Sequence, residues 1–131
     1  MNKAVVLINH QQLNIEVEEH LRRKTMNYHA HVFFDLAEEQ QIQQLRIKLC
    51  ERLSPEIFIG RLLLKAVGPL PKPMFQMQFE QYFLDEVILQ LTDLFSDFPV
   101  LTHPLIEDEY LAHTEHARWF GERLTLNLSG L

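Results

Sequence analysis

Residues 27–35, Asn-Tyr-His-Ala-His-Val-Phe-Phe-Asp, are the stretch that most constrains the fold of this chain. Side chains of a β-strand point alternately to the two faces of a sheet, so one face here is apolar and the other carries two histidines. His29 and His31 then stand side by side, close enough to bind one metal ion. Alternatively, both are polar residues on a solvated sheet face. The stretch predicts a strand with one core face and one polar face.

The composition is that of a single globular domain. The chain has 131 residues, of which 47% are hydrophobic, enough to bury one core. Its formal net charge of −6 gives no basic surface for nucleic acid or an anionic membrane. No stretch approaches the roughly 20 apolar residues of a membrane span. The single cysteine, Cys50, cannot close a disulfide within the chain. We therefore expect a cytoplasmic protein that binds neither nucleic acid nor membrane.

Hydrophobic periodicity predicts the order of the remaining elements. Asp35 is placed to cap the first helix, and the prolines of 68–73 predict a loop because they lack amide donors. The expected elements are a helix over 37–53, a strand within 57–67, the loop 68–73, a strand over 74–80, a helix over 81–95, a strand over 99–103, a helix over 107–119 that stops at Gly121, and a last strand through Leu124, Leu126 and Leu128.

This order predicts an α+β fold, a ferredoxin-like βαββαβ sandwich with an antiparallel sheet and an extra C-terminal helix and short strand. The first and third strands would lie in the middle, with the fourth beside the first and both helices on one face. Residues 27–131 would form this domain, and residues 1–26 an N-terminal arm of unknown role. An exposed second face with Phe33 and Met74 would favour a homodimer. That second face would carry His29, His31, Phe33, Gln76 and His103.

Several different motifs follow one another at characteristic spacings along the chain. They are His29-X-His31-Val-Phe-Phe, Gly68-Pro-Leu-Pro, His103-Pro, His113 ten residues after His103, and Trp119 six residues further. Together they resemble the DOPA 4,5-dioxygenase family, small ferredoxin-like proteins that open the ring of a catechol beside one hydroxyl. The resemblance implies a small aromatic substrate and Fe(II), or another divalent metal such as Zn(II), held by His29, His31 and His103. His113 would be the catalytic acid or base, since imidazole exchanges protons near neutral pH.

Three positions depart from the family pattern. Leu70, Gln76 and Ala112 stand where the family has histidine, glutamate and aspartate. Leucine cannot transfer a proton, and the amide of glutamine is a weaker metal ligand than a carboxylate. Two hypotheses follow. The chain is an extradiol-type dioxygenase in which Phe33, Leu70 and Gln76 contact the substrate, or it is a degenerate, non-catalytic homologue that binds a ligand or metal or oligomerises, and whose metal can be lost.

Overall fold

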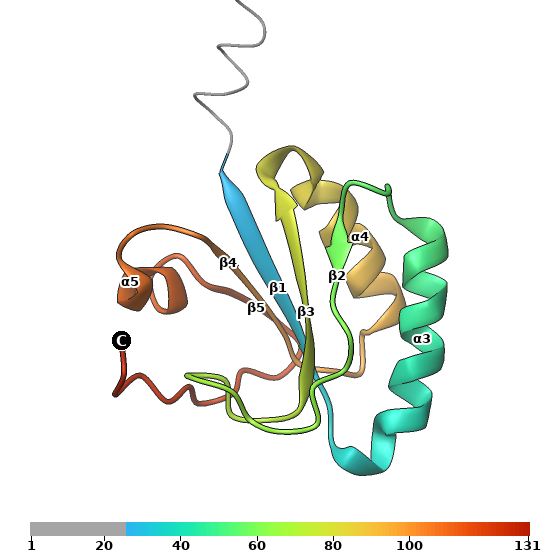
Figure 1. The fold of residues 1–131 in the computed structure, drawn as a ribbon, viewed down its shortest axis with the longest axis horizontal. Coiled ribbons are helices and arrows are strands. Elements are labelled where there is room, and N and C mark those ends of the chain that lie inside the picture. Colours follow the sequence, from blue (N-terminus) through green and yellow to red (C-terminus); the bar gives the residue numbers. More distant parts are fainter. Residues whose placement is uncertain (1–25) are drawn as a thin grey trace, which may run out of the picture.

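The computed structural model describes residues 26–131, and five antiparallel strands form one sheet in the order β2-β3-β1-β4-β5 (Figure 1). As predicted, β1 and β3 lie side by side in the middle and β4 pairs with β1. The α+β, ferredoxin-like arrangement is therefore confirmed. The strands are β1 (Asn27–Phe33), β2 (Phe58–Ile59), β3 (Met74–Glu80), β4 (Val100–Pro104) and β5 (Arg118–Phe120).

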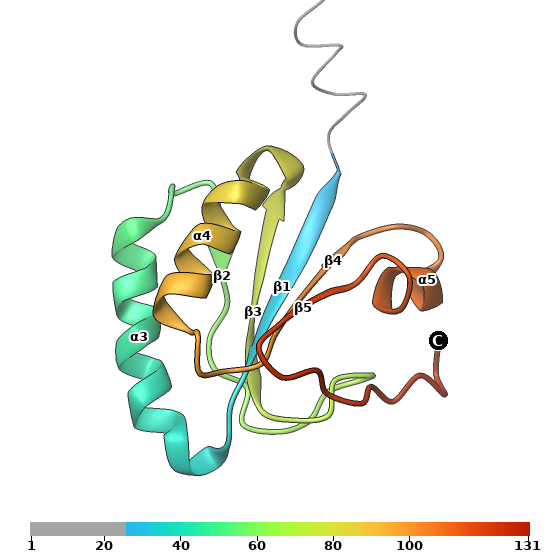
Figure 2. The same ribbon diagram turned by 180° about the vertical axis from the view of Figure 1, so that it is seen from behind.

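Two helices, α3 (Glu39–Arg52) and α4 (Leu84–Leu94), cover one face of the sheet (Figures 1 and 2). Each follows a short 3₁₀ turn, η1 (Leu36–Glu38) before α3 and η2 (Gln81–Phe83) before α4. Asp35 is the N-cap residue of η1, as predicted, and its backbone N–H donates to the Glu38 side chain at 2.9 Å. This reciprocal cap sets where the chain turns from β1 into the helical layer.

The core under these helices comes from alternate residues of the central strands. Every second residue of β1 and β3 faces the helices, which bring their own apolar stripes to the same layer. None of the buried members exposes more than 8% of its surface, and the rings of Phe75 and Phe95 lie 5.6 Å apart. The predicted covered face is thus correct. Its members from β1, the residue directly after β1, and β3 are Tyr28, Ala30, Val32, Phe34, Phe75, Met77 and Phe79, and its helical members include Ile42, Leu49, Val87 and Leu91.

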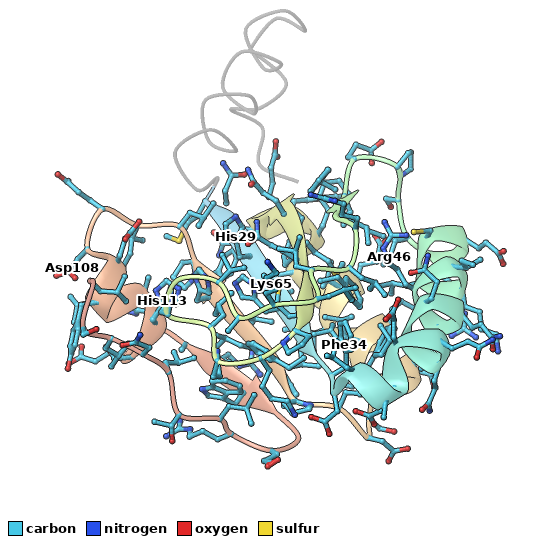
Figure 3. The ribbon with its side chains drawn as sticks, turned by 60° about the horizontal axis from the view of Figure 1, so that its bottom comes forward. His29, Phe34, Arg46, Lys65, Asp108 and His113 are labelled. Carbon is cyan, nitrogen blue, oxygen red and sulfur yellow. The ribbon has the colours of Figure 1, made fainter. Side chains whose placement is uncertain are left out.

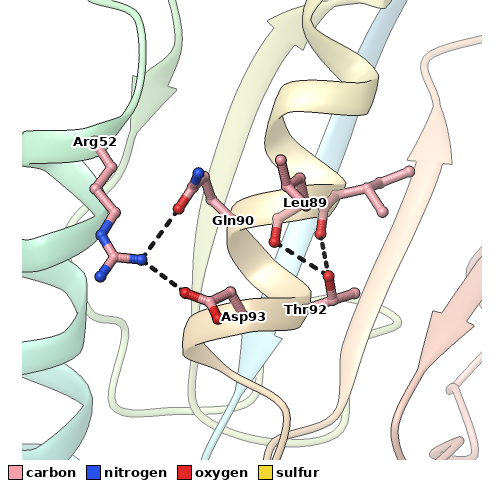
Figure 4. A network of polar contacts seen from close by, with 6 residues as sticks. Arg52, Leu89, Gln90, Thr92 and Asp93 are labelled. Carbon is pink, nitrogen blue, oxygen red and sulfur yellow. Dashed lines mark hydrogen bonds and ion pairs between the residues drawn. The ribbon is translucent and has the colours of Figure 1, made fainter.

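Polar contacts join the helices at their outer edges. Arg52 of α3 binds Asp93 of α4 at 2.8 Å and also donates to Gln90 (Figure 4). This pair is solvent-exposed, so its contribution to stability is small. Arg46 donates to the backbone oxygens of Ile59 and Gly60 and ties α3 to the β2 edge. The helical layer is therefore held by burial, with polar links at its rim.

The opposite face is more covered than the sequence predicted. The short helix α5 (Glu109–His113), the loop 60–73 and the C-terminal residues 121–131 lie on this side (Figures 1 and 2). Phe33 and Met74 are buried there within the chain, so they no longer favour a homodimer, which stays a prediction. The second core consists of Phe33, Leu70, Met74 and Leu101, with Leu63, Ala117, Trp119, Leu124 and Leu126 packed against them.

Two expected elements are wrong, and a third is shorter than its apolar run. The helix predicted over 107–119 is only α5, because residues 118–120 pair with β4 as strand β5. Gly121 therefore follows a strand, with φ +72°, and a Cβ there would lie 2.8 Å from the Phe98 carbonyl oxygen. The alternating leucines of 124–128 form no strand, and within 57–67 only β2 and an isolated bridge from Leu63 to Met74 pair with β3.

The predicted N-terminal arm lies outside the described residues, apart from Met26. None of the helices in the described part of the chain is both long and apolar enough to cross a membrane.

Candidate functional site

The register of β1 and β4 brings three histidines together on the second face of the sheet. His29 lies directly opposite His103 across the β1–β4 ladder, and His31 is two residues along the same side of β1. The ring centroids of the three imidazoles are 5.1 to 5.6 Å apart. One ligand nitrogen from each lies within 4.8 Å of the others. The structure thus places His29, His31 and His103 together, as the sequence predicted.

The closest contact in the cluster joins two imidazole nitrogens. Nε2 of His31 lies 3.0 Å from Nε2 of His103. Nδ1 of His103 is 3.1 Å from the Pro104 carbonyl oxygen, an acceptor, so we assign its hydrogen to Nδ1. Nε2 of His103 then offers a lone pair towards His31. Two nitrogens bound at right angles to one ion, at the usual metal–nitrogen distance, are about 3 Å apart. With a hydrogen on Nε2 of His31 the contact is a hydrogen bond, and the same spacing fits a cation shared by the two nitrogens.

The inner histidine of the cluster is incompletely paired. Nδ1 of His31 is buried and has no hydrogen-bond partner among the described residues. A buried polar atom without a partner is uncommon in a folded protein, because its lost hydration is not replaced. Such an atom marks a group retained for something other than stability, and here it belongs to a buried histidine of the cluster.

Burial keeps the three histidines neutral. Desolvation, followed by repulsion from His103, lowers the pKa of His31 well below its usual value. Desolvation also lowers the pKa of His103 to about 4, against the opposing effect of its bond to the Pro104 carbonyl. The pKa of His29 is lowered by burial too, and Gln78 partly offsets this. The lowered pKa values keep the three imidazoles neutral at neutral pH, and neutral imidazole is the form that binds metals.

A cavity of about 490 Å³ opens beside the cluster. Figure 3 shows His29, from β1, and His113, from α5, on the side of the sheet away from α3. The side chain of Phe33 is not in the lining: it is fully buried and stacks on Trp119 at 5.8 Å. The cavity is lined by His29, His31, Leu63, Val67, Gly68, Pro69, Leu70, Met74, Gln76, His103, Pro104, Leu105, Ile106, Glu109, Ala112, His113 and Leu131.

His113 is the fourth histidine at this cavity. Asp108 caps α5 by accepting from the backbone N–H of Leu111, and this short helix places His113 at its last residue. Nδ1 of His113 is 2.8 Å from the Glu109 carbonyl oxygen and donates to it, so Nε2 is left with a free lone pair. The rings of His113 and His103 lie 4.1 Å apart. His116 lies beyond the end of α5 and does not line the cavity.

One comparison with known proteins identifies a family. A family model, described as the Dopa 4,5-dioxygenase family, matches residues 28–130. The chain belongs to the Dopa 4,5-dioxygenase family. A solved structure from Nostoc punctiforme, described as a "putative dioxygenase", is 32% identical, with a TM-score of 0.72. That match covers 79% of this chain and 89% of the other. A search of curated proteins finds no match.

The two departures at 70 and 112 from the Dopa 4,5-dioxygenase pattern both make the cavity more apolar. Leu70 lies on the loop after Gly68, and Ala112 lies on α5 before His113. Both side chains are buried and neither can ionise, so these two positions of the wall carry no charge. The ionisable side chains that line the cavity are the four histidines and Glu109.

Gln76, the third departure, lies beside His29. Its Nε2 is 3.4 Å from Nε2 of His29, and Oε1 of Gln78 is 3.2 Å from the same nitrogen. Sequence reasoning missed Gln78, although its register opposite His29 follows from pairing β1 with β3. The metal group found among the described residues has three histidines and no carboxylate. A three-histidine set is one that Zn(II) accepts, whereas Fe(II) oxygenases more often use two histidines and a carboxylate. The donor atoms fit a divalent transition metal without selecting one.

Proposed function

We propose that this Dopa 4,5-dioxygenase family member holds Fe(II) with His29, His31 and His103 and cleaves a small catechol beside one hydroxyl. The observation that carries the proposal is the 3.0 Å approach of Nε2 of His31 to Nε2 of His103, at the floor of a cavity large enough for an aromatic ring. When bound, Fe(II) supplies the electron transfer by which O₂ reacts with a catechol, so that both oxygen atoms enter the ring-opened product.

The chain's own residues would bind and orient the substrate. The three ligand imidazoles are neutral, so a divalent cation keeps its full charge in a cavity with a largely apolar wall. That charge favours the two oxygens of a catechol in their ionised form, since opposite charges attract strongly where water is excluded. Gln76, on the cavity wall beside His29, is placed to donate its amide N–H to one of these oxygens.

His113 would take the proton that a catechol hydroxyl loses. Its Nδ1–H is held by the Glu109 carbonyl, so the lone pair is on Nε2, the nitrogen that accepts the proton. The same imidazolium can return the proton to the ring-opened product. Leu70 and Ala112 have no proton to exchange, so beside the ligand histidines the lining offers His113 and the exposed Glu109 for acid–base work. His113 is the better placed, because its ring lies 4.1 Å from that of His103.

The test is metal content followed by oxygen consumption. The full chain, loaded anaerobically with Fe(II) and dialysed, should retain close to one iron per chain and consume O₂ with a catechol. His31→Gln should lose most of the iron, whereas His116→Gln, a histidine outside the cavity, should retain it. Iron retained equally by the His31→Gln variant, or no O₂ uptake with any catechol by the iron-loaded chain, would contradict the proposal.

The second candidate function is a non-catalytic binding domain, and the apolar residues at 70 and 112 favour it. A Gln76→Glu, Leu70→His double variant separates the two functions. If the native chain binds metal and catechol but consumes no O₂, and the double variant does consume it, the native chain is the degenerate homologue. Equal O₂ uptake by both proteins would instead show that the native residues suffice.

A further inference from the structure

The charge of the cavity lining is unbalanced. Among the described residues that line it, Glu109 is the only charged side chain apart from the histidines, and none is lysine or arginine. Lys65, on the loop 60–73, is exposed and does not line the cavity, Lys72 pairs with Asp35, and Arg118 lies over the ring of Phe120. An anionic group entering the cavity would meet no basic side chain and would approach one carboxylate.

Most of the cavity lining other than the histidines is an apolar wall. It is formed by the loop 60–73, by the start of β3 and by the connection from β4 to α5. Leu70, Met74 and Ala112 are buried, and Ile106 is half-buried. The cavity volume of about 490 Å³ falls in the range of sites that enclose drug-sized molecules, so it has room for more than one aromatic ring. The apolar side chains of this wall are Leu63, Val67, Leu70, Met74, Leu105, Ile106 and Ala112.

We infer that the cavity selects catechols whose ring substituent is uncharged and apolar, and discriminates against those whose substituent carries a carboxylate. This inference rests on the proposed function only in placing the catechol oxygens at the histidines. With the oxygens there, the ring substituent points towards the apolar wall and the α5 rim. Burial of an apolar substituent in this wall is favourable.

A carboxylate in the same place loses hydration without gaining a partner. Transfer of an unpaired charge out of water is strongly unfavourable, and the Glu109 carboxylate adds like-charge repulsion. Specificity of this kind needs no added attractive contact, because a group left without a partner is sufficient to reject the wrong ligand. Glu109, the first residue of α5, and Ile106, just before this helix, are therefore the lining residues that should determine specificity.

A matched pair of ligands tests the inference by equilibrium binding. 4-Propylcatechol and 3-(3,4-dihydroxyphenyl)propionate share the ring and a three-carbon substituent, and differ by a terminal carboxylate. Isothermal titration of each into the full chain, metal-free and loaded with redox-inactive Zn(II), should give at least about tenfold tighter binding of the neutral ligand. The readout requires no turnover.

Three variants test whether the affinity difference between the two ligands arises in the cavity. Ile106→Arg should bring the two affinities to within about threefold of each other by giving the carboxylate a partner. Glu109→Gln, at an exposed position, should narrow the difference by about twofold to threefold through loss of repulsion alone. Leu64→Arg adds the same charge at an exposed residue that lines a separate groove with Arg46 and Arg61, and should leave the affinity ratio unchanged.

The outcomes separate this inference from the proposed function. Equal or tighter binding of the propionate, or an affinity ratio that moves equally in Leu64→Arg and Ile106→Arg, would overturn the inference and leave ring cleavage intact. Preferential binding of propylcatechol without O₂ uptake by the iron-loaded chain would support the inference while the catalytic proposal fails. If neither catechol binds, with or without Zn(II), both are wrong.

Discussion

The two faces of the sheet are filled by the same strands in different ways. On one face, alternate residues of β1 and β3 meet two regular helices, and the result is a closed apolar core. On the other, short or irregular segments cover the strands and leave a cavity with histidines at its floor. Helices bring continuous apolar stripes to a sheet, whereas loops do not. The comparison shows that one sheet can carry stability on one face and a site on the other.

The largest effect should come from the helix-covered face. Phe75→Ala removes a fully buried ring that packs on Phe95, and should lower the free energy of unfolding by about 3–5 kcal/mol. Urea denaturation at neutral pH measures it. Phe58→Ala, at an exposed ring, should change stability by less than about 0.5 kcal/mol. A cost for Phe75→Ala no greater than that of the control would mean that this face is not the main stabilising core.

Acid should destabilise the folded chain mainly by protonating the histidines on the second face of the sheet. His103 has its pKa lowered to about 4 in the folded chain, while the unfolded chain binds the proton near 6.5. The unfolded state therefore takes up protons first, and the stability present above pH 6.5 is lost as the pH falls towards 4. The loss from His103 alone should be on the order of 3 kcal/mol. Urea denaturation of the metal-free chain at several pH values in this window measures it.

Replacing both His31 and His103 should raise stability and lower metal binding, which separates the two roles of the sheet faces further. In a His31→Leu, His103→Leu variant, the unpaired buried nitrogen and its neighbour are replaced together by apolar side chains. Replacing both partners of a buried polar pair is neutral or stabilising, so we expect a gain of about 1 kcal/mol at neutral pH and a larger one at pH 5. Iron retention should fall at least about tenfold. A variant as acid-sensitive as the native chain would contradict the assignment of that sensitivity to these histidines.

The smallest effect is expected at the outer edge of the helical layer. Arg52→Ala removes the exposed pair with Asp93 in Figure 4 and should cost no more than about 1 kcal/mol. The cost should decline further in high salt, because exposed charges are screened. Thermal unfolding at low and high salt measures both. A cost comparable with that of Phe75→Ala would show that charge pairing, rather than burial, holds the helices to the sheet.

The regular half of the molecule is predictable because its signals are periodic. The alternation in 27–35 and 74–80 assigns the side chains of β1 and β3 to their faces, and the helical spacing after Asp35 locates α3. The same alternation puts His29 and His31 on one face of β1. Pairing with β4 then adds His103, whose register a local pattern determines least well and which lies directly opposite His29.

The irregular half is not predictable from local pattern. The helical period of 107–119 continues past His113, yet the chain leaves the helix there because residues 118–120 gain hydrogen bonds to β4. The leucines at 124 and 126 alternate as in a strand, but they pack on the second core instead of pairing. Phe33 was expected to contact a substrate, and Trp119, brought over it by β5, covers its ring. Tertiary contacts decide such segments, and a local window does not contain them.

The side chains of the core and those of the histidine site alternate along the same strand, β1. The geometry of the site therefore depends on the register of β1 in the sheet. Ala30 and Val32 point into the helix-covered core while His29 and His31, their neighbours, point the other way. A slip of one residue would turn the imidazoles into that core and the apolar pair out of it. If the proposed metal binds at these histidines, a refolded sample that recovers its full metal content has recovered the native alignment of its central strand, which gives a simple assay for correctly folded material.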